Sequence, residues 1–461
     1  MRQFYVMLSL FFFLFLGSIN AQEKISEEVL KEIQTSYLKD PYTKAARNAL
    51  INNEISDLAK NWDQTGKLDH YFDYRVEIEG SRTDQKSSGR CWMFTSMNVM
   101  RPKVMEQLNT DDFEFSENYL YFWDLFEKSN LFLENVIETA DKSFENRYVD
   151  HYFSSPVGDG GVWNSYINLA KKYGLVPKAE MPETHSSSNT RWLRRLLNRK
   201  LREFGLELRE LVIARKDNNV IQERKVEMLK DVYRMLALNL GEPPTEFQWR
   251  YKDKEGNLSD YKTYTPRSFM QEVLPEVKLD DYVMLMNDPS RPYYKYYEIE
   301  NYRNVEEGVN WKYINLPNDD LKRFAIRSIK ANEAMYASCD VGKQLDNERG
   351  FAAMENYDFE SLYGVDFHMS KRDRILSGES GSTHGMALIA VDLDDKGRPV
   401  KWQFENSWGP ESGHQGFLTF GDDWFDNYIF RLVIHKQFID QNILDILQEE
   451  PILLPPWDPM S

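Results

Sequence analysis

The hydrophobic pattern of the chain changes at about residue 278, and this change constrains the fold more than any other feature. Upstream of it, apolar residues recur at three- and four-residue steps, which is the spacing typical of amphipathic helices. Downstream of it, short apolar runs bounded by turn residues are typical of strands. Runs of helices followed by runs of strands predict an α+β fold with segregated layers.

These patterns predict individual elements in both halves. Upstream, the predicted helices are two or more between 25 and 62 that break at Pro41, followed by 92–107, 119–128 and 162–173. Downstream, the predicted strands are 281–286, 334–341, 386–392 and 400–405, with one helix at 319–331.

A charged segment separates the two halves. Leucines recur at three- and four-residue steps across 190–240, which predicts a helical insertion. Its basic residues between 191 and 202 fit either a solvated helix face or a contact between subunits. The alternating aromatic residues Phe247, Trp249 and Tyr251, followed by a turn, then predict a β-hairpin.

The chain ends in EEPILLPPWDPMS, which contains four prolines. Proline fixes φ and removes a backbone donor, so this segment can form neither a helix nor an inner strand, and we expect an extended arm. The predicted organisation is a signal peptide at 1–21, an N-terminal helical part at 22–185, a helical insertion with a hairpin at 186–277, a β-rich part at 278–445 and the arm at 446–461.

The first 21 residues have the pattern of a secretory signal peptide. Arg2 provides a short basic region, 6–16 is almost wholly apolar, and 19–21 is an acceptable cleavage site. The apolar run is shorter than the roughly 20 residues that span a bilayer, so a retained membrane anchor is the less favoured alternative. We expect an exported protein, periplasmic or secreted, with no membrane span once the signal is removed.

The charge and the cysteine count exclude several function classes. The net charge of −17, from 57 basic and 74 acidic residues, repels phosphate backbones, so we expect no nucleic acid partner. The histidines show no shared metal-ligand spacing, and we expect no metal and no cofactor. Of the two cysteines, Cys339 lies in an apolar strand pattern and is expected to be an inert core residue.

The other cysteine, Cys91, has the position of a nucleophile. It lies in QKSSGRCWMF, at the start of a helical pattern and directly after a flexible Ser-Gly pair. A thiol at a helix N-terminus feels the positive end of the helix dipole, which favours the thiolate. Since a free cysteine is most often a small buried hydrophobe, position alone does not decide between the two roles.

Three further residues supply the groups that an activated cysteine needs. His384 lies in SGSTHGMALIAVD, between a small-residue loop and a strand, and Asn406 follows in QFENSWG. The thiol needs an adjacent base, and the base needs a third group that fixes its tautomer. The amide of Gln85, a few residues before Cys91, can stabilise the oxyanion of a tetrahedral intermediate.

The order of these motifs resembles the papain superfamily of cysteine peptidases. The sequence departs from the typical pattern of this superfamily in two ways, which narrows the set of families that it can resemble. Ser88 stands where many secreted members have a second cysteine, and the gap from Cys91 to His384 is about twice the roughly 130–150 residues that are typical, so a large insertion is expected.

Longer phrases resemble one family within that superfamily, the bleomycin hydrolase and bacterial aminopeptidase C family. The resemblance covers about 25–461. The phrases are DQKSSGRCWMF, FSENYLYFWD, DGGVWNSYINLAKKYGLVPK, ASCDVGK, ENSWG and PPWDPM.

The resemblance implies a papain-like core with a helical insertion, assembled as a homohexamer with enclosed active sites. It also implies the role of each catalytic residue: Cys91 as nucleophile, His384 as general base and then acid, Asn406 as the orienting group and Gln85 as the oxyanion donor. For substrate binding it implies the backbone of Asp159, Gly160 and Gly161, and the chain end at Ser461.

The activity that the resemblance implies is that of a thiol aminopeptidase acting on peptides. Family members commonly continue for a few residues beyond WDPMS, so we expect weaker single-residue trimming and some cleavage of dipeptide-length or N-blocked substrates. An endopeptidase or dipeptidyl-type peptidase is therefore one alternative. A non-catalytic peptide-binding scaffold is another, and the presence of all four catalytic residues argues against it.

Overall fold

The computed structural model describes residues 24–37, 40–64, 67–77 and 80–460. The described residues form two compact units: those up to residue 60, together with 359–365, make the first, and the remaining ones make the second. The predicted signal peptide and Ser461 lie outside the described residues. Within the described ranges, no helix is both long and apolar enough to cross a bilayer.

The first unit consists of short helices. They are α1 (Glu27–Ser36), α2 (Pro41–Asn52), α3 (Ile55–Ala59) and α13 (Phe359–Tyr363). The predicted break at Pro41 is confirmed, because this proline begins α2, where a missing N–H leaves no hydrogen bond unmade. The Asp40 carboxylate caps the helix by accepting hydrogen bonds from the N–H groups of Tyr42 and Thr43.

The helical part of the second unit contains the three helices that the sequence predicts. They are α4 (Cys91–Leu108), α5 (Glu117–Glu138) and α7 (Trp163–Tyr173), with a shorter helix α6 (Arg147–Ser154) between the last two. α5 is much longer than predicted. The Ser116 hydroxyl caps it by accepting a hydrogen bond from the N–H of Tyr119 at 3.1 Å.

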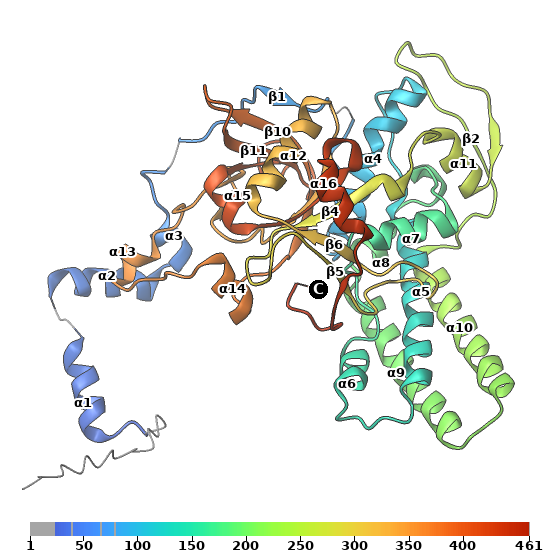
Figure 1. Ribbon diagram of the computed structural model, residues 1–461, viewed down its shortest axis with the longest axis horizontal. Coiled ribbons are helices and arrows are strands. Elements are labelled where there is room, and N and C mark those ends of the chain that lie inside the picture. The colour runs from blue at the N-terminus through green and yellow to red at the C-terminus, as the bar shows by residue number, and fades with distance from the viewer. Residues whose placement is uncertain (1–23, 38–39, 65–66, 78–79, 461) are drawn as a thin grey trace, which may run out of the picture. The chain divides into compact units, whose positions relative to one another are not determined.

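The predicted helical insertion contains two long helices. They are α9 (Arg191–Ile213) and α10 (Asn218–Leu240), and both pack against α5, with the three helices side by side in Figure 1. The chain turns at Arg215, which has a positive φ of 54°, and Asp217 caps α10. The predicted hairpin is confirmed as β2 (Phe247–Trp249) paired with β3 (Lys262–Tyr264), and it leads into α11 (Pro266–Val273).

The strand-rich part forms one twelve-stranded sheet. Along its main path the strands are β14 (Ile452–Leu454), β5 (Lys295–Ile299), β6 (Lys312–Asn315), β4 (Tyr282–Met286), β13 (Ile429–His435), β7 (Met335–Cys339), β10 (His384–Leu393), β11 (Pro399–Glu405), β12 (Phe417–Gly421), β9 (Phe351–Ala352) and β8 (Leu345–Asp346), and β1 (Tyr74–Arg75) pairs with β10. The accompanying helices are α12 (Asn318–Lys330), α14 (Lys371–Ser377), α15 (Asp422–Tyr428) and α16 (Gln441–Leu444). All four predicted strands and the predicted helix at 319–331 are present.

The packing of α4 on β10 brings the two halves together. A Cβ atom on Gly385 would lie 3.4 Å from the Thr95 hydroxyl of α4 and 3.2 Å from the Tyr336 hydroxyl of β7. Glycine at this position therefore lets the helix approach the strand closely. Because Cys91 begins α4 and His384 begins β10, this packing sets the thiol and the imidazole beside each other.

Candidate active site

Cys91 is the first residue of α4, and its side chain is partly accessible. Burial alone raises the pKa of its thiol. The charge of His384, a hydrogen bond with that side chain, and backbone hydrogen bonds from Gly385 and Trp92 outweigh burial, so the pKa lies below its ordinary value. The site therefore favours the thiolate, which is the nucleophilic form.

His384 is buried and held by two neighbours. Its Nε2 lies 2.7 Å from Oδ1 of Asn406, and the ring of Trp408 lies 4.8 Å away, centroid to centroid. Asn406 Oδ1 also accepts a hydrogen bond from the Ser407 N–H at 2.8 Å, so this atom is the acceptor and His384 Nε2–H is the donor. This tautomer leaves Nδ1 of His384 to face the thiol.

The imidazole and the thiol stabilise each other's charged forms. Burial lowers the pKa of His384, but the charge of Cys91, the hydrogen bond to it and the hydrogen bond to Asn406 raise the pKa above its ordinary value. A thiol pKa that is lowered and an imidazole pKa that is raised describe a thiolate–imidazolium pair. This pair supplies both a nucleophile and a proton donor for the leaving group.

Gln85 is buried, and its amide is oriented by a residue that the sequence analysis did not single out. The Ser407 hydroxyl donates to Gln85 Oε1 at 2.7 Å, and the Gln85 N–H donates to the Ser407 carbonyl at 2.8 Å. Gln85 Nε2 donates one hydrogen to the Ser88 carbonyl at 2.6 Å. The second hydrogen of that amide is left for an oxyanion at Cys91.

Replacing Gln85 by Ala is expected to lower kcat about 10²–10³-fold, because one donor to the developing oxyanion is lost. Ser407→Ala keeps the amide but removes the hydroxyl that orients it, and we expect a smaller fall of about tenfold. Steady-state kinetics on a fluorogenic peptide substrate measure both. A Gln85→Ala enzyme with the kcat of the wild type would remove Gln85 from the oxyanion site.

Asp159 supports the loop before Cys91. Its buried carboxylate accepts hydrogen bonds from the Gly89 N–H at 3.1 Å, the Tyr121 hydroxyl at 2.9 Å and the Thr190 hydroxyl at 2.5 Å. Its carbonyl accepts from Trp92 Nε1 at 2.7 Å. Since both its side chain and its carbonyl are engaged, Asp159 positions the nucleophile loop.

Of the next two glycines, Gly161 leaves its backbone open at the site, whereas the Gly160 carbonyl accepts a hydrogen bond from Lys128 Nζ at 2.6 Å. A Cβ on Gly160 would meet no atom within 4 Å, whereas a Cβ on Gly161 would lie 2.6 Å from the indole of Trp92. Within the described ranges, neither the N–H nor the C=O of Gly161 takes part in a hydrogen bond. The predicted strand-like pairing of substrate with this segment stays a prediction, and Gly161 offers the free backbone groups for it.

The proline-rich arm lies against the loop that precedes His384. It begins as the edge strand β14, which pairs with β5, and its last described residue, Met460, is buried. The Pro459 carbonyl lies 3.7 Å from the position of a Cβ on Gly381. The predicted contact of Ser461 with substrate concerns a residue outside the described ranges.

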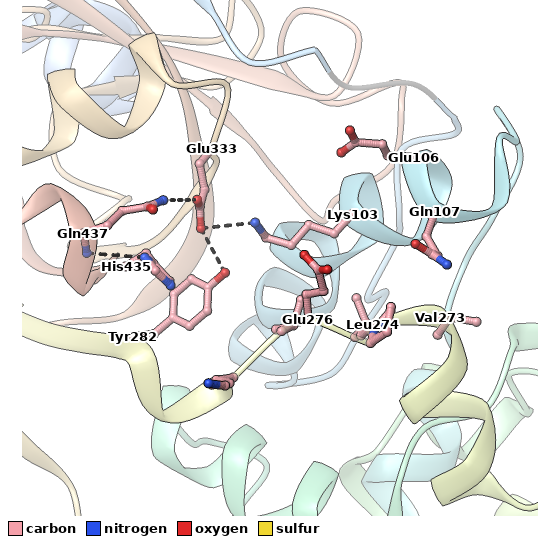
Figure 2. Close-up of a pocket in the computed structure, with 13 residues that line it drawn as sticks. Lys103, Glu106, Gln107, Val273, Leu274, Glu276, Tyr282, Glu333, His435 and Gln437 are labelled. Carbon is pink, nitrogen blue, oxygen red and sulfur yellow. Dashed lines mark hydrogen bonds and ion pairs between the residues drawn. The ribbon is translucent and has the colours of Figure 1, made fainter.

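A pocket of about 500 Å³ is lined by other residues, none of them a catalytic group (Figure 2). Its most buried charged group is Glu333, whose carboxylate accepts from the Tyr282 hydroxyl at 2.9 Å, pairs with Lys103 at 3.3 Å and accepts from Gln437 at 3.4 Å. The carboxylate is therefore satisfied by its own neighbours, and we assign this pocket no chemistry.

The fold and the thiolate–imidazolium pair with its asparagine define a papain-like cysteine peptidase. The chain belongs to the Peptidase C1-like family, whose model matches residues 24–461. It is 39% identical to aminopeptidase C of Lactobacillus delbrueckii subsp. lactis and 38% identical to bleomycin hydrolase of Homo sapiens, in each case over 95% of this chain and 98% of the relative. A solved structure of PepW from Lactobacillus rhamnosis HN001 matches with a TM-score of 0.91 and 39% identity, covering 95% of this chain and 98% of that one.

Proposed function

We propose that this chain is a thiol aminopeptidase that removes residues from the N-terminus of peptides. Its chemistry is that of a cysteine peptidase, and its relatives include proteins named aminopeptidase C and aminopeptidase G. The observation that carries the proposal is the position of the arm, whose Pro459 carbonyl lies beside Gly381 in the loop that leads to His384. An arm that lies beside the loop leading to His384 leaves room for only a short stretch of substrate before the scissile bond.

The residues of the site account for each step of hydrolysis. The Cys91 thiolate attacks the carbonyl carbon, and the oxyanion that forms accepts hydrogen bonds from Gln85 Nε2 and the Cys91 N–H. The His384 imidazolium gives its proton to the departing amine as the C–N bond breaks, leaving a thioester on Cys91. Neutral His384 then takes a proton from water, which attacks the thioester and releases the acid, while Asn406 holds the ring throughout.

The test compares two peptides that differ only at the amino terminus. We expect the free-amino peptide to lose residues from that end, and the N-acetylated peptide to be cleaved more slowly, because the acetyl group takes up part of the space next to the arm. Some cleavage of the N-acetylated peptide is still expected, because the arm is short. Mass spectrometry of timed samples measures both. Equal cleavage of the two peptides at internal bonds would show an endopeptidase instead.

We also propose that the mature protein is a homohexamer. Support comes from the resemblance of the whole chain to a family for which this assembly is expected, and from the basic, partly exposed start of α9, where Arg191, Arg195 and Trp192 face solvent in the single chain. Light scattering of the purified protein is expected to give about six times the chain mass. A monomer under dilute native conditions would contradict this proposal.

Export is a further part of the proposal. It rests on the sequence of the first 21 residues, with Arg2 before an apolar run and a small-residue cleavage site. An exported aminopeptidase of this kind would act on peptides outside the cytoplasm. Amino-terminal sequencing of the protein recovered from its native host would place the cleavage near Gln22.

A further inference from the structure

Arg431 is a buried cation whose hydrogen-bond partner belongs to the C-terminal arm. Its side chain, on β13, is 4% exposed, and its Nη2 donates to the carbonyl of Met460. The guanidinium lies over the ring of Trp311, 3.9 Å from its centroid. Among the residues the structure describes, no carboxylate lies within ion-pair distance of Arg431, and its Nε has no partner.

The strand register places Arg431 on the face of the sheet that is covered by α4, the helix that begins at Cys91. Arg431 pairs with Ser338 on β7, and Ser338 pairs with Gly385 on β10, the residue after His384. Directly paired residues project from the same face, and the face of Gly385 is the one covered by α4. One strand, β7, lies between β13 and β10. Because neighbouring strands are roughly 4.8 Å apart, Arg431 lies about 10 Å from the strand that carries His384.

Further contacts hold the residues just before Met460. The Asp458 carboxylate forms an ion pair with Arg291 and accepts a hydrogen bond from the Met460 N–H at 3.0 Å. The ring of Trp457 lies under the Arg147 guanidinium, 4.2 Å from its centroid. The arm is therefore fixed along several residues, and the contact with Arg431 is the last that the structure describes.

The burial of Arg431 makes this contact hard to release. A charged donor forms stronger hydrogen bonds than a neutral one, and a buried donor that loses its partner carries the full cost of desolvation. Since Nε is already unpaired, moving the Met460 carbonyl away would leave a second nitrogen of the same guanidinium without a partner. Arg431 thus opposes any shift of the arm.

We propose that Arg431 is a specificity-determining residue, which fixes the Met460 carbonyl and thereby sets how many substrate residues fit between the arm and Cys91. Arg431 acts through the arm, so it is a positioning residue and not a catalytic one. The proposal rests on the proposed aminopeptidase function and adds to it the side chain that determines the length of the released fragment.

The test follows the products of one free-amino peptide and its N-acetylated form with the full-length wild type and three variants. Arg431→Gln removes the charged donor, and Asp458→Asn weakens the second anchor from within the arm. Arg209→Gln is the matched control: Arg209 is also buried, donates to the carbonyls of Thr139 and Lys142, and lies over the Phe144 ring, all in the helical part.

We expect Arg209→Gln to release fragments of the same lengths as the wild type, although the control has a lower Tm. Arg431→Gln and Asp458→Asn are expected to release longer fragments. In Arg431→Gln, the ratio of the rate of single-residue release to the rate of cleavage of the N-acetylated peptide is expected to fall about tenfold, which is the effect of losing one charged hydrogen bond. Titration of Cys91 with a thiol reagent gives the concentration of intact sites. Rates are divided by this concentration, so that unfolded protein is not mistaken for a change in specificity.

If Arg431→Gln and Asp458→Asn, with intact sites, both release fragments of the same lengths as the wild type, the proposal is overturned. If Arg431→Gln does not fold, Asp458→Asn decides alone, because its side chain lies on the arm and outside the sheet. A wild type that removes no amino-terminal residue would instead refute the aminopeptidase function, and the role of Arg431 would fall with it. If Arg209→Gln also releases longer fragments, general destabilisation explains the change in fragment length, and the proposal is likewise overturned.

Discussion

Replacing Cys91 by Ala is expected to abolish peptide hydrolysis, with a loss in kcat of roughly 10⁵-fold or more, as for other covalent catalysts that lose the nucleophile. No acyl-enzyme can form without the thiolate. The fold should survive, because Cys91 is partly accessible and alanine suits the first turn of α4. Thermal unfolding and single-turnover kinetics measure the two effects.

Cys91→Ser provides the companion to this variant. It keeps the size and polarity of the side chain, but the hydroxyl is not ionised by a neighbouring imidazole as a thiol is. We expect it to be nearly as inactive as Cys91→Ala. If Cys91→Ala keeps more than about 1% of wild-type activity, its kcat has fallen by less than about 100-fold. Removal of a nucleophile costs far more than that, so the peptide bond would then be broken without covalent catalysis.

The second large effect is expected for His384→Ala, which removes both the base and the charge that holds the thiol ionised. Only the backbone hydrogen bonds from Gly385 and Trp92 then oppose the effect of burial, so the pKa of the Cys91 thiol rises. We expect kcat/KM to fall at least about 10³-fold at neutral pH. Some activity should return as the pH rises, because hydroxide then deprotonates the thiol.

His435→Ala is a suitable control for this experiment. His435 lies on β13 beside the pocket of Figure 2 and contacts the ring of Tyr282, with a centroid separation of 5.1 Å. Its loss removes an imidazole of similar size from the same sheet without touching Cys91. Equal losses of activity in the two variants would point to a structural cause and contradict the role given to His384.

The sequence predicts much of the fold where periodicity and turn chemistry act locally. α4, α7, the β2–β3 hairpin and four central strands appear where the patterns place them. The turn between α9 and α10 is not predicted, because it depends on Arg215 in a left-handed conformation, with no glycine or proline to mark it. The two-residue strands β1, β8 and β9 are too short to show a pattern, and they exist only through pairing with distant strands.

The residues of the candidate site also fall into those that the sequence predicts and those that it does not. Cys91, His384, Asn406 and Gln85 can be found from the sequence because each lies in a short motif and the motifs have a characteristic order. Ser407, which orients the Gln85 amide, and Arg431, which holds the arm, act across more than 300 and 29 residues of chain respectively. Ser407 lies in the quoted ENSWG motif, but no local pattern shows its role or marks Arg431, because both roles depend on contacts that only the folded chain creates.

The central claim is that Cys91 and His384 form a thiolate–imidazolium pair, and the pH dependence of alkylation tests it most directly. Because the pKa of Cys91 is lowered and that of His384 is raised, the ion pair forms at a pH below the usual titration of a thiol and is lost when His384 deprotonates above its usual range. Cys339 is buried, with a raised pKa, and serves as an internal reference within the same chain. Mass spectrometry of the two cysteine peptides after timed exposure to iodoacetamide gives both rates at each pH. The account predicts rapid modification of Cys91 at pH 6 and none of Cys339, whereas a Cys91 rate that rises only near pH 8.5, as for an ordinary thiol, would contradict it.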